Sequence, residues 1–134
     1  MSLSNNDYQD IMRQYEERRL SNYRLHEQRK KDIYTTIPEI KELDRQITAN
    51  SISLGKQLIS RYDPALRKEY RIKNQVLISQ KQALLKEAGY SSDYLEPIYD
   101  CPDCMDTGYI GNEKCHCFKR SVIELLYEQS NIKE

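Results

Sequence analysis

Residues 101–117, CPDCMDTGYIGNEKCHC, contain every cysteine of the chain and determine how this part of it folds. The segment begins with a C-x-x-C pair and ends with a C-x-C pair, formed by Cys101, Cys104, Cys115 and Cys117. The ten residues between the pairs are long enough for a small hairpin that turns at Gly111-Asn112 and brings the pairs together. Four cysteines crowded into one segment favour a metal site over disulfides in a reducing compartment.

Four thiolates suit tetrahedral Zn²⁺ at roughly 2.3 Å per bond, and such a site adds on the order of 10 kcal/mol to the folding of its loop. The segment has too few apolar residues for a core of its own, so we expect the metal to replace that core. We therefore predict one structural zinc ion held by all four cysteines. Three alternatives remain open: His116 in place of one cysteine, an iron–sulfur cluster, or no metal at all.

The sequence contains no recognisable catalytic machinery. A closed thiolate site organises the chain rather than activating water, and a thioredoxin-like C-x-x-C would need a βαβ setting. His26, the other histidine, lies in a charged stretch where solvent exposure is the simplest explanation. No G-x-x-x-x-G-K-[ST] motif occurs, so no P-loop is expected. We predict no catalytic residues, no cofactor-binding residues besides the zinc ligands, and no small-molecule substrate.

Three helices are predicted upstream of the cysteines. Residues 1–35 lack Gly and Pro, carry Tyr8, Ile11 and Tyr15 at one-turn spacing, and are highly charged thereafter, so only the two ends of this helix are expected to pack. The second helix is predicted to start with a capping box at residues 36–39. Asp63-Pro64 should end it and start the third helix, which Gly89 should close.

The second and third helices each carry one apolar stripe, at Ile40, Leu43, Ile47, Leu54 and Leu58, and at Leu66, Tyr70, Leu77, Leu84 and Ala88. Because two such stripes bury each other, residues 36–88 predict an antiparallel hairpin with the first helix as a third member. The expected fold is mainly α: a helical hairpin or three-helix bundle, then a small zinc knuckle with a short β-hairpin, then a C-terminal helix.

The predicted domains are a helical domain at 1–89, a linker at 90–100, a zinc-binding module at 101–117 and a C-terminal helix at 118–134. The chain stops soon after this last helix without a closing element. We therefore expect it to be a piece of a longer protein.

Charge and hydropathy limit the classes of partner. Lys plus Arg and Asp plus Glu both number 21, so no global field points to nucleic acid. Residues 64–86, with six basic side chains and one acidic, keep weak single-stranded DNA binding open as an alternative. No apolar run approaches a membrane span, and Asn5, Asn6 and Asp7 do not fit a secretory signal, so no membrane partner and a cytoplasmic location are expected.

Several segments together resemble the N-terminal zinc domain of bacterial helicase loaders of the DnaI type. The resemblance covers roughly residues 34–130 and is carried by residues 101–109, 115–118, 37–44, 84–90 and 94–97. In that family the N-terminal domain binds the hexameric replicative helicase, and a following AAA+ ATPase domain engages single-stranded DNA. The resemblance implies a helicase-docking domain of a DnaI- or DnaC-like loader, acting in DNA replication and lying before an ATPase domain that this chain does not contain.

Overall fold

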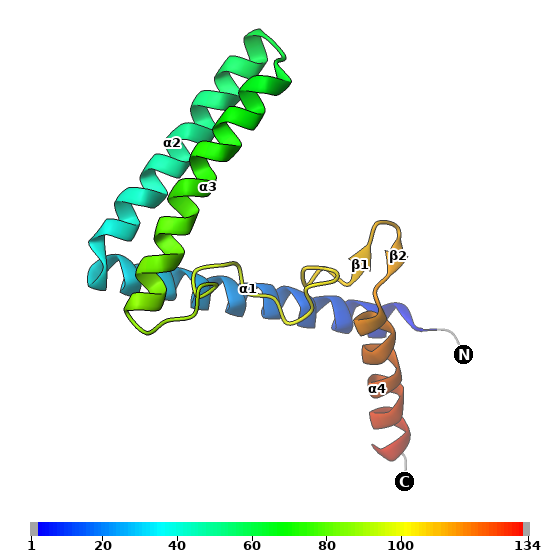
Figure 1. Cartoon of the computed structure of the whole chain (residues 1–134). Coiled ribbons are helices and arrows are strands. Elements are labelled where there is room, and N and C mark those ends of the chain that lie inside the picture. Colours follow the sequence, from blue (N-terminus) through cyan, green and yellow to red (C-terminus); the bar gives the residue numbers. More distant parts are fainter. Residues whose placement is uncertain (1–2, 133–134) are drawn as a thin grey trace. The chain divides into compact units, whose positions relative to one another are not determined.

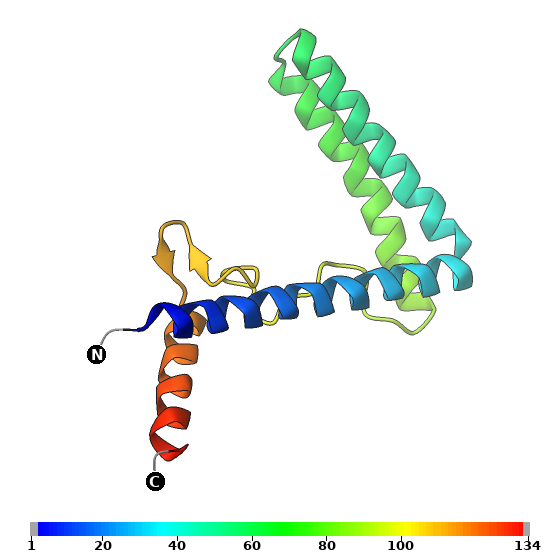
Figure 2. The same cartoon turned by 180° about the vertical axis from the view of Figure 1, so that it is seen from behind.

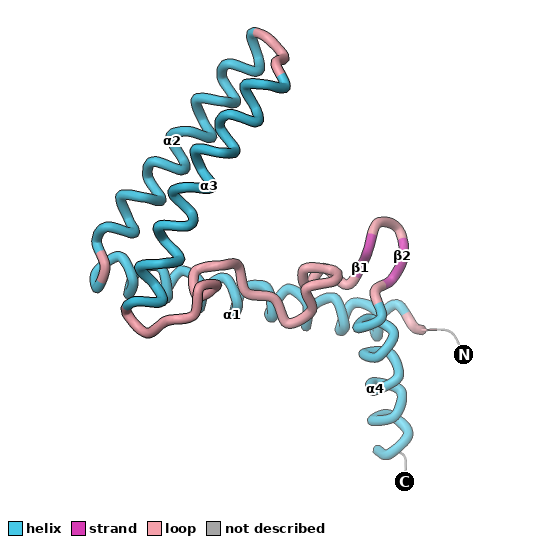
Figure 3. The backbone as a smooth tube through the Cα atoms, viewed as in Figure 1, coloured by secondary structure: helices cyan, strands magenta, loops and turns pink. Residues whose placement is uncertain are grey.

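The computed structural model describes residues 3–132, and the described chain is mainly helical (Figure 1). Its elements are α1 (Asn5–Thr36), α2 (Pro38–Ser60), α3 (Pro64–Glu87), β1 (Tyr109–Ile110), β2 (Glu113–Lys114) and α4 (His116–Ile132). The mainly α fold with a small antiparallel hairpin and a C-terminal helix is therefore confirmed (Figure 3). None of the described helices combines the length and the apolar character needed to cross a membrane.

The chain forms two compact units, and α1 contributes to both. One unit comprises Met1–His26 together with Pro97–Glu134, and the other is the continuous segment Glu27–Glu96. Each unit has its own buried cluster of side chains.

The Glu27–Glu96 unit is built on an antiparallel hairpin of α2 and α3, which lie side by side in both views (Figures 1 and 2). Polar contacts bridge the two helices at successive levels: Lys81 with Asp44, Asn74 with Asn50, and Tyr70 with Ser53. At the base of the hairpin, Ile33, Ile40 and Leu85 form a fully buried cluster. The predicted alternatives were a helical hairpin and a three-helix bundle, and the structure has the hairpin. Only the last turns of α1 belong to this unit.

The helix boundaries follow local chemistry, with one difference from prediction. The Asp63 carboxylate accepts a hydrogen bond from the Ala65 amide at 3.0 Å, and Gly89 has a φ of +93°, so both predicted signals are confirmed. The prediction of a capping box at residues 36–39 is wrong. Thr36 is the last residue of α1, and its hydroxyl donates to the Asp32 carbonyl within that helix. Ile37 occupies the N-cap position of α2 without a side-chain cap.

The core of the other unit joins the beginning of α1 to the cysteine segment and α4. Ile11, Tyr15 and Phe118 are each at most 2% exposed and pack together. The Tyr8 and Tyr109 hydroxyls share a hydrogen bond of 2.8 Å across this core. The Tyr8, Ile11 and Tyr15 stripe thus packs on the cysteine segment and α4. The buried apolar residues of α1 lie toward its ends, but the expectation that only the ends pack is wrong, because Arg19 and Asn22 in the middle of the helix hydrogen-bond to Asp106.

Candidate metal centre

The four cysteine sulfurs lie together, as the spacing of the two pairs predicted. All four Sγ atoms are within 4.8 Å of one another, with 3.8 Å between Cys101 and Cys115 and 3.6 Å between Cys104 and Cys117. Four sulfurs at roughly 2.3 Å from a tetrahedral ion would be about 3.8 Å apart. The spacing fits a metal ion and is far longer than the roughly 2 Å of a disulfide bond. The four thiols can therefore hold a metal.

The backbone of the first pair forms a tight knuckle. The Asp106 amide donates to the Cys101 carbonyl at 3.3 Å, and the Thr107 amide donates to the Cys104 carbonyl at 3.2 Å. The Gly108 amide points at the Cys104 sulfur, 3.4 Å away. A thiolate that accepts a backbone N–H is stabilised in its charged form, which is the form that binds metal.

A two-stranded hairpin carries the chain back to the second pair. Tyr109 pairs with Lys114 and Ile110 with Glu113, so the turn falls at Gly111-Asn112 as predicted. The Cys115 amide then donates to the Gly108 carbonyl at 2.8 Å, which places the third sulfur opposite the knuckle. Because α4 begins at His116, Cys117 lies in its first turn.

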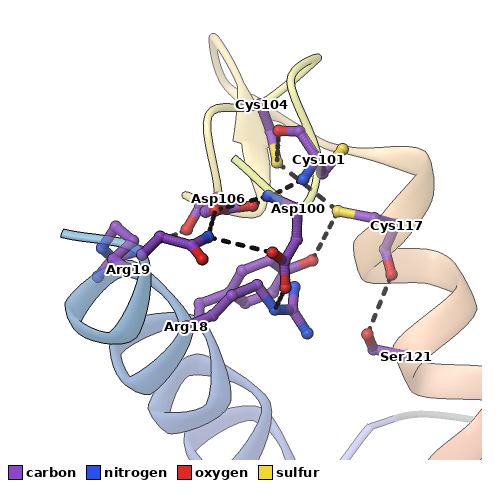
Figure 4. Close-up of polar contacts among 10 residues, drawn as sticks. Arg18, Arg19, Asp100, Cys101, Cys104, Asp106, Cys117 and Ser121 are labelled. Atoms are coloured by element: carbon purple, nitrogen blue, oxygen red, sulfur yellow. Dashed lines mark hydrogen bonds and ion pairs between the residues drawn. The ribbon is translucent and has the colours of Figure 1, made fainter. Parts of the chain in front are cut away.

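Asp106 connects the knuckle to α1 (Figure 4). Its side chain is fully buried, and its carboxylate accepts hydrogen bonds from the Cys101 amide at 2.8 Å and the Asp100 amide at 3.0 Å. The Asn22 side chain of α1 donates to the same carboxylate at 3.0 Å, and Arg19 donates to the Asp106 carbonyl at 2.7 Å. One carboxylate therefore fixes the start of the cysteine segment against a helix some eighty residues earlier in the sequence.

The conformation that buries this carboxylate is unusual. Met105 and Asp106 have φ values of +55° and +60°, the left-handed region that side chains other than Gly rarely adopt. The cost is on the order of 1 kcal/mol per residue, and the hydrogen bonds of Asp106 offset it. As a result the Met105 side chain is held outward and is 60% exposed.

Aromatic and cationic groups of α1 also face the sulfurs. The Tyr15 hydroxyl lies 2.8 Å from the Cys117 sulfur, and the Arg18 guanidinium stacks 5.0 Å from the centre of the Tyr15 ring. Arg18 also pairs with Asp100 at 3.2 Å. Four thiolates around a divalent cation carry a net charge of −2, so a phenol donor and nearby arginines stabilise the loaded site.

The thiols differ in acidity. Burial raises the pKa of Cys104, but hydrogen bonds from the Gly108 amide and from neighbouring cysteines outweigh it and bring the pKa down to about 7. Burial raises the pKa of Cys117 to about 12, despite the opposing hydrogen bond from Tyr15. At Cys115 the Cys117 amide lowers the pKa, yet burial and contacts with the Cys101 and Cys104 thiols leave it raised. Of Cys104, Cys115 and Cys117, Cys104 is therefore the thiol that most readily becomes a thiolate.

His116 stands at the edge of the cluster. Its Nε2 lies 2.8 Å from the Asp103 carboxylate and 3.8 Å from the Cys101 sulfur. Both the His116 and the Asp103 side chains are more than half exposed, whereas Cys101, Cys104 and Cys115 are buried. The four sulfurs are therefore the more buried candidate ligand set, and Cys101, Asp103 and His116 form a second, more exposed set that could also hold a metal.

Sequence reasoning found the cysteines and missed the groups that support them. Asp106, Asn22, Arg19 and Gly108 were not singled out, and Tyr15 was noted only as a packing residue. The Tyr8, Ile11 and Tyr15 stripe was the available signal, because an apolar stripe on a charged helix needs a partner. Nothing in a single sequence shows that Asp106 is buried.

No protein-family model matches the chain, and comparisons with curated proteins and with solved structures find no match either. The geometry of the site itself is consequently the basis for its chemistry. A tetrahedral ion held by all four sulfurs has no position left for water or a substrate. Such an ion would cross-link three segments of chain: the knuckle, the end of the hairpin and the first turn of α4.

Proposed function

We propose that this chain is a non-catalytic docking domain, held together by a structural Zn²⁺, that binds the hexameric replicative helicase as part of a bacterial helicase loader. The observation that supports a structural, non-catalytic metal is the set of four sulfurs within 4.8 Å of one another, with spacings of 3.8 and 3.6 Å that suit a tetrahedral ion. Zinc is the ion that such sites most commonly hold in proteins. The assignment of the partner rests on the resemblance of residues 34–130 to loader domains.

A surface beside the metal centre supports protein recognition. A pocket of about 280 Å³ is lined by Tyr23, Pro97, Ile98, Tyr99 and Met105, together with polar groups of α1. Three of these side chains are unusually exposed for their type: Tyr23 is 61% exposed, Tyr99 is 40% exposed and Met105 is 60% exposed. Aromatic and methionine side chains around a small apolar hollow are typical of the centre of a protein interface.

The charge of this unit also favours a protein partner over nucleic acid. The segments 1–26 and 97–134 carry eight Lys and Arg against eleven Asp and Glu, a balance of −3. A tetrathiolate zinc centre would add further negative charge. A surface that binds a phosphate backbone needs the opposite sign.

The test is binding of this chain to the replicative helicase of its host, measured by light scattering on a sizing column. We expect a complex with the native chain and none with Cys101→Ser plus Cys104→Ser. Met105→Glu should weaken the complex at least about tenfold if the pocket is in the interface. Ile110→Glu, at a similarly exposed position on β1, is the matched control. A native chain that does not bind at all would overturn the helicase proposal.

Single-stranded DNA binding is the second candidate function, and the Glu27–Glu96 unit favours it. This unit has thirteen Lys and Arg against ten Asp and Glu, a balance of +3, and Arg67, Lys68, Arg71 and Lys73 are all exposed on α3. The test is fluorescence anisotropy of a labelled oligonucleotide at low salt. Micromolar binding that weakens steeply with salt, and that Arg67→Glu plus Arg71→Glu abolishes, would support this candidate.

A further inference from the structure

A second group of metal-ligating side chains adjoins the four cysteines. The ligand atoms of Cys101, Asp103 and His116 all lie within 4.8 Å of one another. The His116 Nε2 is 2.8 Å from the Asp103 carboxylate and 3.8 Å from the Cys101 sulfur. Thiolate, carboxylate and imidazole are the three kinds of protein ligand that Zn²⁺ accepts. One imidazole nitrogen therefore faces both of the other donors.

The spacing of these atoms suits an ion after a small adjustment. Oxygen and nitrogen ligands at about 2.1 Å from a tetrahedral ion lie roughly 3.4 Å apart, and a sulfur at about 2.3 Å lies roughly 3.6 Å from the nitrogen. His116 and Asp103 are closer than this because they share a hydrogen bond, and an ion would replace the shared proton. Both side chains are more than half exposed, so they can move the few tenths of an ångström required without disturbing the core.

The charge around the cluster favours a second cation. Four thiolates around one Zn²⁺ ion leave a net charge of −2, and the Asp103 carboxylate adds to it. A pocket of about 340 Å³ borders Cys101, Asp103 and His116, so an ion has access to them from solvent. The charged groups of this pocket are three carboxylates and two guanidinium groups, from Asp100, Asp103, Glu124, Arg18 and Arg120. Because Arg18 pairs with Asp100 at 3.2 Å, one of the two guanidinium groups is already neutralised.

We propose that the protein binds a second divalent cation of the zinc class, held by Asp103, His116 and the Cys101 sulfur, which the two ions share. A thiolate sulfur is a soft ligand that keeps free electron pairs after it has bound one ion, so it can bridge two. The proposal rests on the structural Zn²⁺ proposed above, because Cys101 belongs to both sites. With one shared ligand, two exposed ligands and a position left to water, the second ion should bind more weakly than the first and exchange with solvent.

The first experiment is a zinc titration of the reduced, metal-free full chain in competition with chromophoric chelators of different strength. We expect two zinc ions per native chain, one tightly and one weakly bound. His116→Ala and Asp103→Asn should each lose the weakly bound ion and keep the tightly bound one. Glu124→Gln is the matched control, because it changes a carboxylate of the same pocket outside the ligand set, and it should keep both ions.

Cobalt substitution tests whether the sulfur is shared. Co²⁺ takes the same ligands as Zn²⁺, and two high-spin Co²⁺ ions bridged by one sulfur couple magnetically. The electron paramagnetic resonance signal of the first Co²⁺ should therefore weaken as the second equivalent binds to the native chain. In His116→Ala the signal should stay at its one-ion level. Two ions that share no ligand would instead give additive signals.

The outcomes separate the second site from the structural one. A single zinc ion per native chain at saturation overturns the second site and leaves the structural zinc in place. A weakly bound ion that persists in both His116→Ala and Asp103→Asn is an adventitious ion only, and additive cobalt signals overturn the sharing of Cys101. Loss of both ions in these two variants would place His116 and Asp103 in the first site and overturn the proposal. A native chain that binds no zinc would overturn the structural zinc as well.

Discussion

At the scale of single residues, Gly108 is the position in the cysteine segment where we expect a substitution to be most destabilising. Its φ is +86°, and a Cβ atom there would lie 3.0 Å from the Tyr15 ring and 3.2 Å from the Phe118 ring. Its amide also points at the Cys104 sulfur. A left-handed turn, a close aromatic contact and a thiolate hydrogen bond therefore coincide at one residue.

We expect Gly108→Ala to lower the free energy of unfolding of the unit of Met1–His26 and Pro97–Glu134 by about 2 to 4 kcal/mol. The left-handed conformation accounts for about 1 to 2 kcal/mol and the collision with two buried rings for the rest. The measurement is chemical denaturation of the zinc-loaded chain, monitored by tyrosine fluorescence.

Two other glycines separate the two causes. Gly111 has a φ of +63° but open space around it, so Gly111→Ala should show only the cost of the backbone conformation.

Gly55 lies within α2, and a Cβ atom there would meet no other atom within 4 Å, so Gly55→Ala should stabilise the hairpin unit by about 0.5 to 1 kcal/mol. Equal effects of Gly108→Ala and Gly111→Ala would show that the aromatic contact does not matter.

The acidities of the thiols predict how zinc affinity depends on pH. With a pKa of about 12 for Cys117 and a raised pKa for Cys115, both thiols are protonated at neutral pH in the metal-free chain, and an ion must displace those protons. Affinity should therefore fall as the pH is lowered. It should fall more steeply below pH 7, where Cys104, with a pKa of about 7, also becomes protonated.

The measurement is competition with a chromophoric chelator at several pH values between 6 and 8.5. About one more proton per ion should be released at pH 6 than at pH 8. An affinity that does not change over this range would contradict a thiolate site.

At the scale of elements, a partly buried ion pair links α2 to α3. The Lys81 ammonium lies 2.5 Å from the Asp44 carboxylate, the two side chains are 20% and 23% exposed, and the Tyr34 hydroxyl donates to the same carboxylate. Burial and this carboxylate both raise the pKa of Tyr34. The end of α1 and both helices of the hairpin thus meet at Asp44.

Asp44→Asn should destabilise the Glu27–Glu96 unit by about 1 to 3 kcal/mol, because it leaves Lys81 without a counter-charge in a poorly hydrated position. The matched control is Glu42→Gln. Glu42 pairs with Arg45 on the exposed surface of α2, so the unfolding midpoint of the Glu42→Gln variant should hardly differ from that of the native chain. Thermal unfolding followed at 222 nm distinguishes the two variants, and equal midpoints would contradict the role given to Asp44.

The elements were predictable where the signal is local. Asp63-Pro64, Gly89 and the Gly111-Asn112 turn act on their immediate neighbours, and all three behave as predicted. Residues 36–39 fit the capping-box pattern equally well, but α1 continues through Thr36, and the threonine hydroxyl bonds back within its own helix. Cys101, Cys104, Cys115 and Cys117 were found because metal ligation restricts spacing. Asp106 and Tyr15 act through contacts with residues distant in sequence, which no local pattern reveals.

At the scale of the whole molecule, removal of the metal should affect one unit and spare the other. The unit of Met1–His26 and Pro97–Glu134 has a core of Ile11, Tyr15 and Phe118 against the cysteine segment, whereas Glu27–Glu96 has a separate core and no cysteine. A chelator should therefore lower the unfolding temperature of the first unit only, and two thermal transitions should become visible.

Hydrogen exchange locates the effect. Amides of residues 8–19 and 101–122 should lose protection after chelation, while those of 40–58 and 66–85 should keep it. Calorimetry of the loaded and stripped protein gives the two transitions. A single transition that shifts as a whole would show that the units are energetically coupled.

The order of the units along the chain has a consequence for how the protein is made. The hairpin unit is continuous, so it can fold as soon as residues 27–96 have left the ribosome. The stripe of Tyr8, Ile11 and Tyr15 is synthesised first, but Tyr109 and Phe118, on which it packs, follow only some ninety or more residues later. During most of synthesis this stripe is therefore exposed to chaperones, and a metal ion held by all four cysteines could be bound only at the end, after Cys117 has been added.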